Sequence, residues 1–205
     1  MRFPERGLYA ITQPENKTMA QVLSEVEAAL KGGAVVVQYR DKNPIDAVAL
    51  ASCLLTACHA YQVPLLINDS VELALTVGAD GVHLGKDDGE LADARHRLGP
   101  AAIIGVSCYN DIQKARAAAN HGADYVAFGR FFPSDSKPLA LPADTATLTR
   151  AKQQLNLPIV AIGGILPENG GQLIAAGADL LAVIGGIFDH EPEVSARAYQ
   201  ALFNP

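Results

Sequence analysis

Short apolar runs recur along the whole chain and alternate with amphipathic segments. The runs begin near residues 7, 34, 64, 81, 102, 125, 158 and 180. Helical periodicity marks the segments between them, such as Met19–Leu30, Asp46–Ala60, Val71–Val77, Asp111–Asn120, Thr145–Leu155 and Pro192–Leu202. Strands that are apolar on both faces and alternate with helices predict a parallel sheet covered by helices.

A glycine turn precedes four of the apolar runs. GGAVVVQ begins at Gly32, GADGVHLG at Gly78, GADYVAFG at Gly122 and GADLLAVIG at Gly177. Each copy follows a helical stretch, and glycine at a helix C-terminus adopts the left-handed conformation without the steric cost of a Cβ atom. Four such helix-to-strand turns predict a repeated βα unit.

The number of apolar runs indicates which parallel-sheet fold the chain adopts. Eight parallel strands that alternate with helices predict a closed (β/α)8 barrel, with a doubly wound open sheet as the alternative. No linker or shift of composition divides the chain, so residues 1–205 are expected to form a single TIM-barrel domain of the α/β class. A hydrophobic content of 49% is enough for one well-filled core.

The charged residues and the length of the apolar runs limit the classes of binding partner. The 16 Lys and Arg residues are scattered and outnumbered by 22 Asp and Glu, so a nucleic-acid surface is not expected. No run reaches the length of a membrane span, and the N-terminus lacks the apolar core of a signal peptide. We expect a cytoplasmic protein that acts on small molecules. The sequence leaves its oligomeric state open, a homo-oligomer included.

The three cysteines are expected to be structural thiols in a reducing cytosol. Cys53, Cys58 and Cys108 have no CxxC spacing. Cys53 and Cys58 fall in one predicted helix, which suits buried thiols better than a disulfide or a metal site.

Glycine pairs follow the last two apolar runs, as Gly163-Gly164 and Gly185-Gly186. The strand ends that carry these pairs are where TIM barrels build their active sites, and phosphate is often bound there by backbone N–H groups. A side chain would block that approach, so both pairs together favour a phosphate site. Simple tight turns are the alternative.

Two acidic residues end neighbouring strands. Asp69 follows the third run and Asp88 follows the fourth, so their carboxylates are expected to converge. Close carboxylates require a shared proton or a hard cation such as Mg²⁺. Arg40, Lys42 and Lys137 approach the same mouth from other strands, a combination that suits a diphosphate. The alternatives are that Asp69 caps the following helix and that Asp88 is an ordinary loop acid.

Other catalytic signatures are missing from the sequence. The histidines show no metal-ligand spacing: His59, His96, His121 and His190 are expected to be solvated, and His83 at a strand end is a candidate for a role behind the site. No Ser-His-Asp arrangement, GxSxG or GxGxxG is found. Acyl-enzyme chemistry and hydride transfer therefore have no support.

These features resemble thiamine-phosphate synthases along nearly the whole chain. The carrying motifs are VQYRDK (Val37–Lys42), LLINDSVELALTVGADGVHLGKDD (Leu65–Asp88), IIGVS (Ile103–Ser107), GADYVAFGRFFPSDSKP (Gly122–Pro138) and PIVAIGGI (Pro158–Ile165). Each motif alone is weak, but their combination in this order is highly specific.

The resemblance implies a Mg²⁺-dependent transferase that joins a hydroxymethylpyrimidine diphosphate to a thiazole phosphate and releases diphosphate. It implies that the pyrimidine diphosphate contacts Gln38, Tyr39, Arg40, Asp41, Lys42, Asn68, Ser107 and Lys137. The catalytic residues among these would be Arg40, Lys42, Ser107 and Lys137. It implies that the thiazole phosphate contacts Ser134, Asp135, Ser136, Gly164, Ile184 and Gly185, and that Mg²⁺ binds to Asp69 and Asp88.

Two departures from the family pattern concern the thiazole phosphate. The family often has Thr where this chain has Ser134 and Ser136, so the hydroxyl is kept at both positions. The family often has Ser where this chain has Gly185, so this chain lacks the hydroxyl at that position. A thiazole tautomerase on the same barrel is the nearest alternative, but it would not need the basic and acidic residues of the diphosphate site. A non-catalytic phosphate-binding barrel and a phosphosugar epimerase are further alternatives.

Overall fold

A computed structural model of the protein describes residues 1–85, 88–133 and 142–204. Its strands form a closed barrel in which each strand pairs in parallel with the next and the last pairs with the first. They are β1 (Gly7–Ile11), β2 (Ala34–Tyr39), β3 (Leu65–Asn68), β4 (Gly81–Leu84), β5 (Ile103–Tyr109), β6 (Tyr125–Gly129), β7 (Ile159–Ile162) and β8 (Leu180–Val183). The predicted barrel is confirmed, and the open sheet is excluded.

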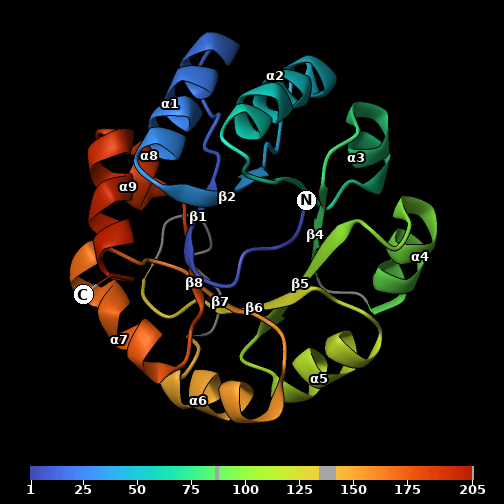
Figure 1. Cartoon of the computed structure of the whole chain (residues 1–205), viewed down its shortest axis with the longest axis vertical. Coiled ribbons are helices and arrows are strands. Elements are labelled where there is room, and N and C mark those ends of the chain that lie inside the picture. The colour runs from blue at the N-terminus through green and yellow to red at the C-terminus, as the bar shows by residue number, and fades with distance from the viewer. Residues whose placement is uncertain (86–87, 134–141, 205) are drawn as a thin grey trace.

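Helices surround the barrel, as the view along its axis shows (Figure 1). They are α1 (Met19–Lys31), α2 (Ala47–Ala60), α3 (Val71–Val77), α4 (Asp88–Leu98), α5 (Ile112–Asn120), α6 (Thr145–Gln154), α7 (Pro167–Ala176), α8 (Gly185–Phe188) and α9 (Pro192–Ala201). Every helical segment named from the sequence is confirmed to within one residue at each end. Side-chain caps explain this agreement, because Thr18, Asp46 and Asp111 accept hydrogen bonds from the free N–H groups of α1, α2 and α5.

The glycine turns behave as predicted in three of the four copies. Gly78, Gly122 and Gly177 have φ angles of 71°, 87° and 118°. The first copy differs, because Gly32 ends α1 in a right-handed conformation with φ −73°, and Gly33 takes the positive angle of 100°. The prediction for Gly32 was therefore wrong by one residue, and the second glycine of that copy makes the turn.

The Asp of each GAD sequence fastens the starts of two neighbouring strands. Its carboxylate accepts a hydrogen bond from a backbone N–H of the preceding strand, and its own N–H donates to the carbonyl of the same residue. The pairs are Asp80 with Leu65 (2.9 and 3.0 Å), Asp124 with Ile104 (2.7 and 2.8 Å) and Asp179 with Ile159 (2.9 and 2.8 Å). We call these paired contacts the Asp clamps. They hold β4 on β3, β6 on β5 and β8 on β7 at the N-terminal ends of the strands.

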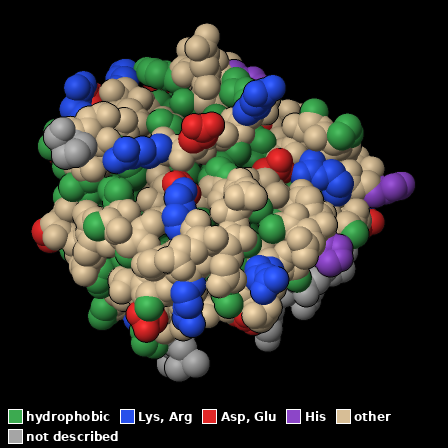
Figure 2. All heavy atoms as spheres, turned by 60° about the horizontal axis from the view of Figure 1, so that its bottom comes forward, with side chains coloured by type: hydrophobic (Ala, Val, Ile, Leu, Met, Phe, Trp, Pro, Cys, Tyr) green, Lys and Arg blue, Asp and Glu red, His purple; other side chains and the backbone are tan. Residues whose placement is uncertain are grey.

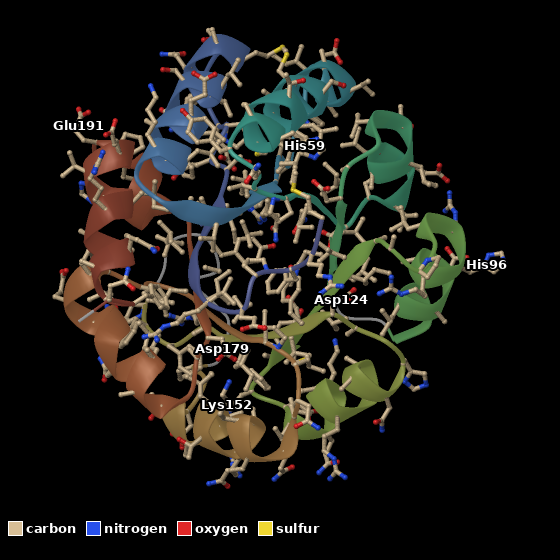
Figure 3. The ribbon with its side chains drawn as sticks, in the orientation of Figure 1. His59, His96, Asp124, Lys152, Asp179 and Glu191 are labelled. Carbon is tan, nitrogen blue, oxygen red and sulfur yellow. The ribbon has the colours of Figure 1, made fainter. Side chains whose placement is uncertain are left out.

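A basic side chain from a preceding helix completes each Asp clamp. His59 of α2 lies 2.9 Å from Asp80, Arg95 of α4 lies 2.6 Å from Asp124, and Lys152 of α6 lies 2.6 Å from Asp179. Figure 3 shows Lys152 directed from its helix toward Asp179, whereas His96 points away from the molecule. His59 is exposed, as expected, and in addition its ring contacts the Asp80 carboxylate. The repeated GAD sequence thus stabilises the pairing of neighbouring strands.

The barrel interior and the helix layer form two separate cores. Tyr9, Val36, Leu66 and Tyr125 are among the side chains that fill the interior, while a larger apolar cluster lies between strands and helices. The ring of Phe3 stacks on that of Tyr125, with 4.0 Å between centroids. In Figure 1 the N-terminal segment crosses this end of the barrel. The N-terminal end of the barrel is therefore covered by the chain itself.

The cysteine prediction is confirmed in part. Cys58 and Cys108 are buried free thiols, but Cys53 is exposed. Helix α2 buries Leu50, Leu54 and Cys58 along one stripe, and Cys53 falls outside it. Burial raises the pKa of the Cys58 thiol to about 12, so this group stays protonated at neutral pH.

The surface shows no gathering of basic side chains on the face drawn in Figure 2, where Lys and Arg are separated by acidic, apolar and polar groups. Within the described ranges, no helix combines the length and the apolar character that a bilayer crossing requires.

The Asp clamps predict a position-specific stability effect. Asp124→Ala removes the partner of the Ile104 N–H and of Arg95, so we expect the free energy of unfolding to fall by about 2 kcal/mol. Glu193→Ala is the matched control, because it removes a carboxylate that only pairs with Arg197 on the surface of α9 and should cost at most about 0.5 kcal/mol. Urea unfolding followed by circular dichroism measures both, and equal losses would contradict the structural role of the clamp.

Candidate active site

A cavity of about 800 Å³ opens at the C-terminal end of the barrel. All strands from β1 to β8 contribute lining residues, and this volume suits small-molecule ligands. Eight of the residues predicted to bind substrate or metal line it: Gln38, Arg40, Asn68, Asp69, Ser107, Gly164, Ile184 and Gly185. The predicted end of the barrel is therefore the one that carries the cavity.

Three other predicted residues do not reach this cavity. Tyr39 is buried between the barrel and the helices, and its hydroxyl donates to Asp41, with 3.4 Å between the oxygens. Burial and the Asp41 carboxylate raise the pKa of Tyr39 to about 12. Asp41 and Lys42 follow in the loop, where Lys42 is exposed. Alternation along β2 explains the outcome, because Gln38 and Arg40 face inward while Tyr39 faces outward.

Five predicted residues cannot be placed. Ser134, Asp135, Ser136 and Lys137 lie outside the described residues. Asp88 is the first residue of α4, but its side chain lies outside the described part. The convergence of Asp88 with Asp69 and the approach of Lys137 stay predictions.

Asp69 is held at the cavity by its backbone. Its φ of 60° is left-handed, and its N–H donates to the carbonyl of His83 on the neighbouring strand at 2.9 Å. Its carboxylate accepts a hydrogen bond from the Asn68 amide at 2.7 Å. Ser70, and not Asp69, caps α3 by accepting from the Leu73 N–H at 3.1 Å. The helix-cap alternative is thus wrong, and the Asp69 carboxylate is left to line the cavity.

The donor chemistry at this edge fits a hard cation. Carboxylate oxygens are the protein ligands that Mg²⁺ prefers. Asp69 directly follows β3, and the chain from the adjacent strand β4 leads to Asp88 at the start of α4. No group of three or more Cys, His or acidic side chains converges within the described ranges. Mg²⁺ commonly binds through one or two carboxylates when a substrate supplies further oxygens.

Arg40 is positioned by a buried threonine that the sequence did not reveal. The Thr12 hydroxyl accepts from the Arg40 N–H at 2.9 Å and donates to the Arg40 carbonyl at 3.1 Å. This pair of bonds extends the β1–β2 pairing past the end of β2. Arg40 lines the cavity, and within the described ranges its guanidinium makes no ion pair.

A second arginine lines the cavity and was missed as a site residue. Arg130 follows β6 directly, just as Arg40 follows β2. The rule that selected Arg40, a basic residue immediately after an apolar run, would have selected Arg130 as well. Two guanidinium groups from different strands therefore contribute to the wall of the cavity.

The glycine pairs are required by the packing of the protein itself. A Cβ atom would lie 2.3 Å from Arg130 Cβ at Gly163 and 2.2 Å from the Pro133 carbonyl at Gly164. At Gly185 it would lie 2.3 Å from a carboxylate oxygen of Asp189, which occupies the space that a serine side chain would need. The positive φ angles of Gly163 (108°) and Gly164 (61°) fit the tight-turn alternative as well. These glycines therefore do not by themselves identify a phosphate site.

Five polar side chains from five strands form a continuous hydrogen-bonded chain across the barrel, which we call the relay. The amide of Gln38 donates to the Tyr9 hydroxyl (2.7 Å), which bonds the Tyr125 hydroxyl (2.8 Å). The Tyr125 oxygen lies 2.8 Å from His83 Nδ1, and His83 Nε2 lies 2.9 Å from the Ser107 oxygen. Burial raises the pKa of both tyrosines, so their hydroxyls stay protonated.

The relay bears on the place expected for His83 behind the site. Its ring is hydrogen-bonded to Ser107, a residue that lines the cavity. The other ring nitrogen is bonded to Tyr125, a neutral phenol and not a carboxylate. A serine hydrolase depends on a carboxylate in that place to stabilise the imidazolium that forms when histidine takes the serine proton. Among the described residues, the group bonded to His83 Nδ1 is therefore a phenol, which does not supply the charge that a serine hydrolase uses.

Tyr9 and Tyr125 stand in apolar runs, and neither was named as a site residue from the sequence. The signal that could have revealed them is their hydroxyl group, since a buried hydroxyl needs a hydrogen-bond partner. Their partners are far apart in sequence, and Tyr9 and Tyr125 are 116 positions apart, so the sequence could not show which groups meet.

Comparisons with known proteins agree on one family. A sequence model described as thiamine monophosphate synthase matches residues 8–187. The thiamine-phosphate synthase of Nitrosococcus oceani is 51% identical over 97% of this chain and 93% of the relative. That of Marinobacter nauticus is 52% identical over 96% of this chain and 90% of the relative.

Solved structures agree in fold. The thiamine phosphate pyrophosphorylase from Pyrococcus furiosus superposes with a TM-score of 0.87 and 30% identity, covering 98% of this chain and 96% of that one. A structure titled "Native KDPGal structure" superposes with a TM-score of 0.79 at 17% identity, which supports the fold alone.

Tyr125 depends on a glycine in the neighbouring strand. A Cβ atom at Gly105 would lie 1.9 Å from the Tyr125 ring, so Gly105→Ala should displace this ring and lower the free energy of unfolding by about 2 kcal/mol. Gly171→Ala is the control, because nothing lies within 4 Å of its Cβ position in α7, and it should be neutral or stabilising by about 0.5 kcal/mol. Equal stability of the two variants in urea unfolding would show that the interior tolerates the extra methyl group.

Proposed function

The chain belongs to the thiamine monophosphate synthase family, and from this premise we propose that it is a Mg²⁺-dependent transferase. It joins a hydroxymethylpyrimidine diphosphate to a phosphoethylthiazole, in its plain or carboxylated form, and yields thiamine monophosphate and diphosphate. The observation that carries this proposal is the convergence of Gln38, Arg40, Asn68, Asp69 and Ser107 on one cavity. These residues come from β2, β3 and β5 and from the loops that follow β2 and β3.

The pyrimidine diphosphate is assigned to the side of the cavity formed by these residues. Arg40 supplies positive charge to the diphosphate. The hydrogen bonds between the Thr12 hydroxyl and the Arg40 backbone hold Arg40 in place. Gln38, Asn68 and Ser107 offer amide and hydroxyl groups to the polar atoms of the substrate. Lys137 is proposed to reach the departing diphosphate, and Lys42 to assist from the exposed loop.

Mg²⁺ is proposed to bind Asp69 and Asp88, and when bound it would neutralise charge on the leaving diphosphate. The protein contributes the carboxylate at Asp69, whose orientation is set by the Asn68 amide and the His83 carbonyl. These contacts keep Asp69 in a left-handed conformation that lets its side chain face the cavity.

The reaction needs positioning and electrostatic stabilisation more than a protein nucleophile. The bond between the pyrimidinyl methylene and the diphosphate breaks, and diphosphate leaves with the electron pair. The aminopyrimidine ring donates electrons to the methylene carbon, and the thiazole nitrogen then forms the new bond to it. This scheme is supported by the Ser107–His83 pair, in which His83 Nδ1 is bonded to the Tyr125 phenol.

The thiazole phosphate is assigned to the opposite wall. Gly164, Ile184 and Gly185 present backbone to the cavity there, and Ser134, Asp135 and Ser136 are proposed to complete the contacts. The Asp189 carboxylate lies beside Gly185 at this wall, and Gln13 donates a hydrogen bond of 3.0 Å to it. The partners are thus two anionic small molecules, and the free thiols support a cytoplasmic location.

Loss of the Arg40 charge tests the diphosphate assignment. Arg40→Ala should lower kcat/KM by about a hundredfold, because one group that stabilises charge in the transition state is removed. Lys137→Ala should have an effect of the same kind. Diphosphate release from the two substrates is measured, with Arg197→Ala, which removes a surface arginine of α9, as the control. Full activity in both site variants would remove the assignment.

Metal removal tests the Mg²⁺ assignment separately. Chelation should abolish diphosphate release, and added Mg²⁺ should restore it. Asp69→Asn should raise the Mg²⁺ concentration needed for half-maximal rate by tenfold or more, at about 1.4 kcal/mol per tenfold. A rate that is indifferent to chelation contradicts the metal dependence, and isomerisation of the thiazole without diphosphate release would identify a tautomerase.

A further inference from the structure

The relay constrains where its protons lie. Each tyrosine hydroxyl has one proton and stands between two partners, so it donates to one and accepts from the other. Once the direction of one bond is chosen, every other bond in the chain follows. The Gln38 amide nitrogen donates to Tyr9. Tyr9 must then donate to Tyr125, and Tyr125 must donate to His83 Nδ1.

The direction of these hydrogen bonds also determines which ring nitrogen of His83 carries the proton. Because Nδ1 accepts the Tyr125 proton, it carries no proton of its own, and the neutral ring holds its proton on Nε2. Nε2 lies 2.9 Å from the Ser107 oxygen, so it donates and Ser107 accepts.

We propose that His83 is a positioning residue, kept as the neutral Nε2–H form by Tyr9 and Tyr125, and that it turns the Ser107 hydroxyl into a hydrogen-bond donor toward the substrate. Ser107 accepts the His83 proton, so its own proton points to the remaining partner in the cavity that it lines. The substrate must therefore present an acceptor atom to Ser107, such as a ring nitrogen of an aminopyrimidine. Gln38, at the other end of the relay, uses its amide N–H internally and keeps its carbonyl oxygen for a donor such as an exocyclic amine.

This assignment also separates the site from a hydrolase. A base that activates serine needs an unprotonated Nε2 to receive the proton, whereas the relay places a proton on that nitrogen. The two arrangements differ in one observable, the nitrogen of His83 that carries hydrogen.

Nitrogen NMR of the protein labelled with ¹⁵N-histidine tests the relay without substrate. His83 signals, identified by their loss in His83→Gln, should show hydrogen on Nε2 and none on Nδ1. Tyr125→Phe keeps the ring but removes the donor to Nδ1, so a population with hydrogen on Nδ1 should appear. Tyr199→Phe is the control, because it removes a buried hydroxyl that donates to the Ile165 carbonyl outside the relay, and the His83 signals should not change.

The role in substrate binding is tested by two histidine replacements. His83→Gln places an amide N–H close to the position of Nε2 and keeps a donor for Ser107, whereas His83→Asn places its amide close to Nδ1 and loses that donor. KM for the pyrimidine diphosphate should rise about tenfold in His83→Asn and be restored to within about threefold in His83→Gln. Thermal unfolding of both variants checks that they fold.

Distinct results would overturn the proposal. Hydrogen on Nδ1 in the unaltered protein, alone or together with Nε2, contradicts the direction of the relay, as do His83 signals that ignore Tyr125→Phe. Equal KM values in the folded Gln and Asn variants contradict the positioning role. The inference about the substrate rests on the proposed function: if the unaltered protein releases no diphosphate, that function fails, while the nitrogen signals still decide the relay.

Discussion

The register of the barrel strands is the constraint on which the site depends. Side chains alternate between the inside and the outside of a strand, so a slip of one residue would exchange the two sets. The Asp clamps fix this register by joining the first residues of paired strands with two hydrogen bonds each. At the other end of the clamped strands, Asn68, His83 and Ser107 face the cavity because these strands begin where they do.

The N-terminal end of the barrel is covered by the chain, whereas the C-terminal end carries the cavity. Tyr125 contacts groups on both sides. Its ring packs against Phe3 on the covered side, and its hydroxyl takes part in the relay on the open side. Gly105 provides the room for this ring in the adjacent strand. A residue that fills the core thereby also directs polar groups at the cavity, which is why core and site cannot be assigned independently in this interior.

The sequence predicted the parts of the molecule that follow from local patterns. Strand and helix positions could be read from periodicity and from capping residues such as Asp111, and Arg40 and Asp69 from their place after apolar runs. Tyr39 was misplaced because a motif was carried over without regard to the alternation of β2. The capping role weighed for Asp69 belongs to Ser70, one residue later, a distinction set by backbone angles that no pattern displays. The relay was out of reach, since it joins residues from five strands across the barrel.

The spacing of the Asp clamps has a consequence for how the chain folds. Each clamp joins residues only 15 or 20 positions apart, so the entropy lost on closing the intervening loop is small. The segments β3–β4, β5–β6 and β7–β8 can thus form early as local units, each with its helix. The pairing of β1 with β8 joins residues from opposite ends of the sequence and has no clamp of this kind. Ring closure is therefore the step of high contact order, and we expect it to limit the rate of folding.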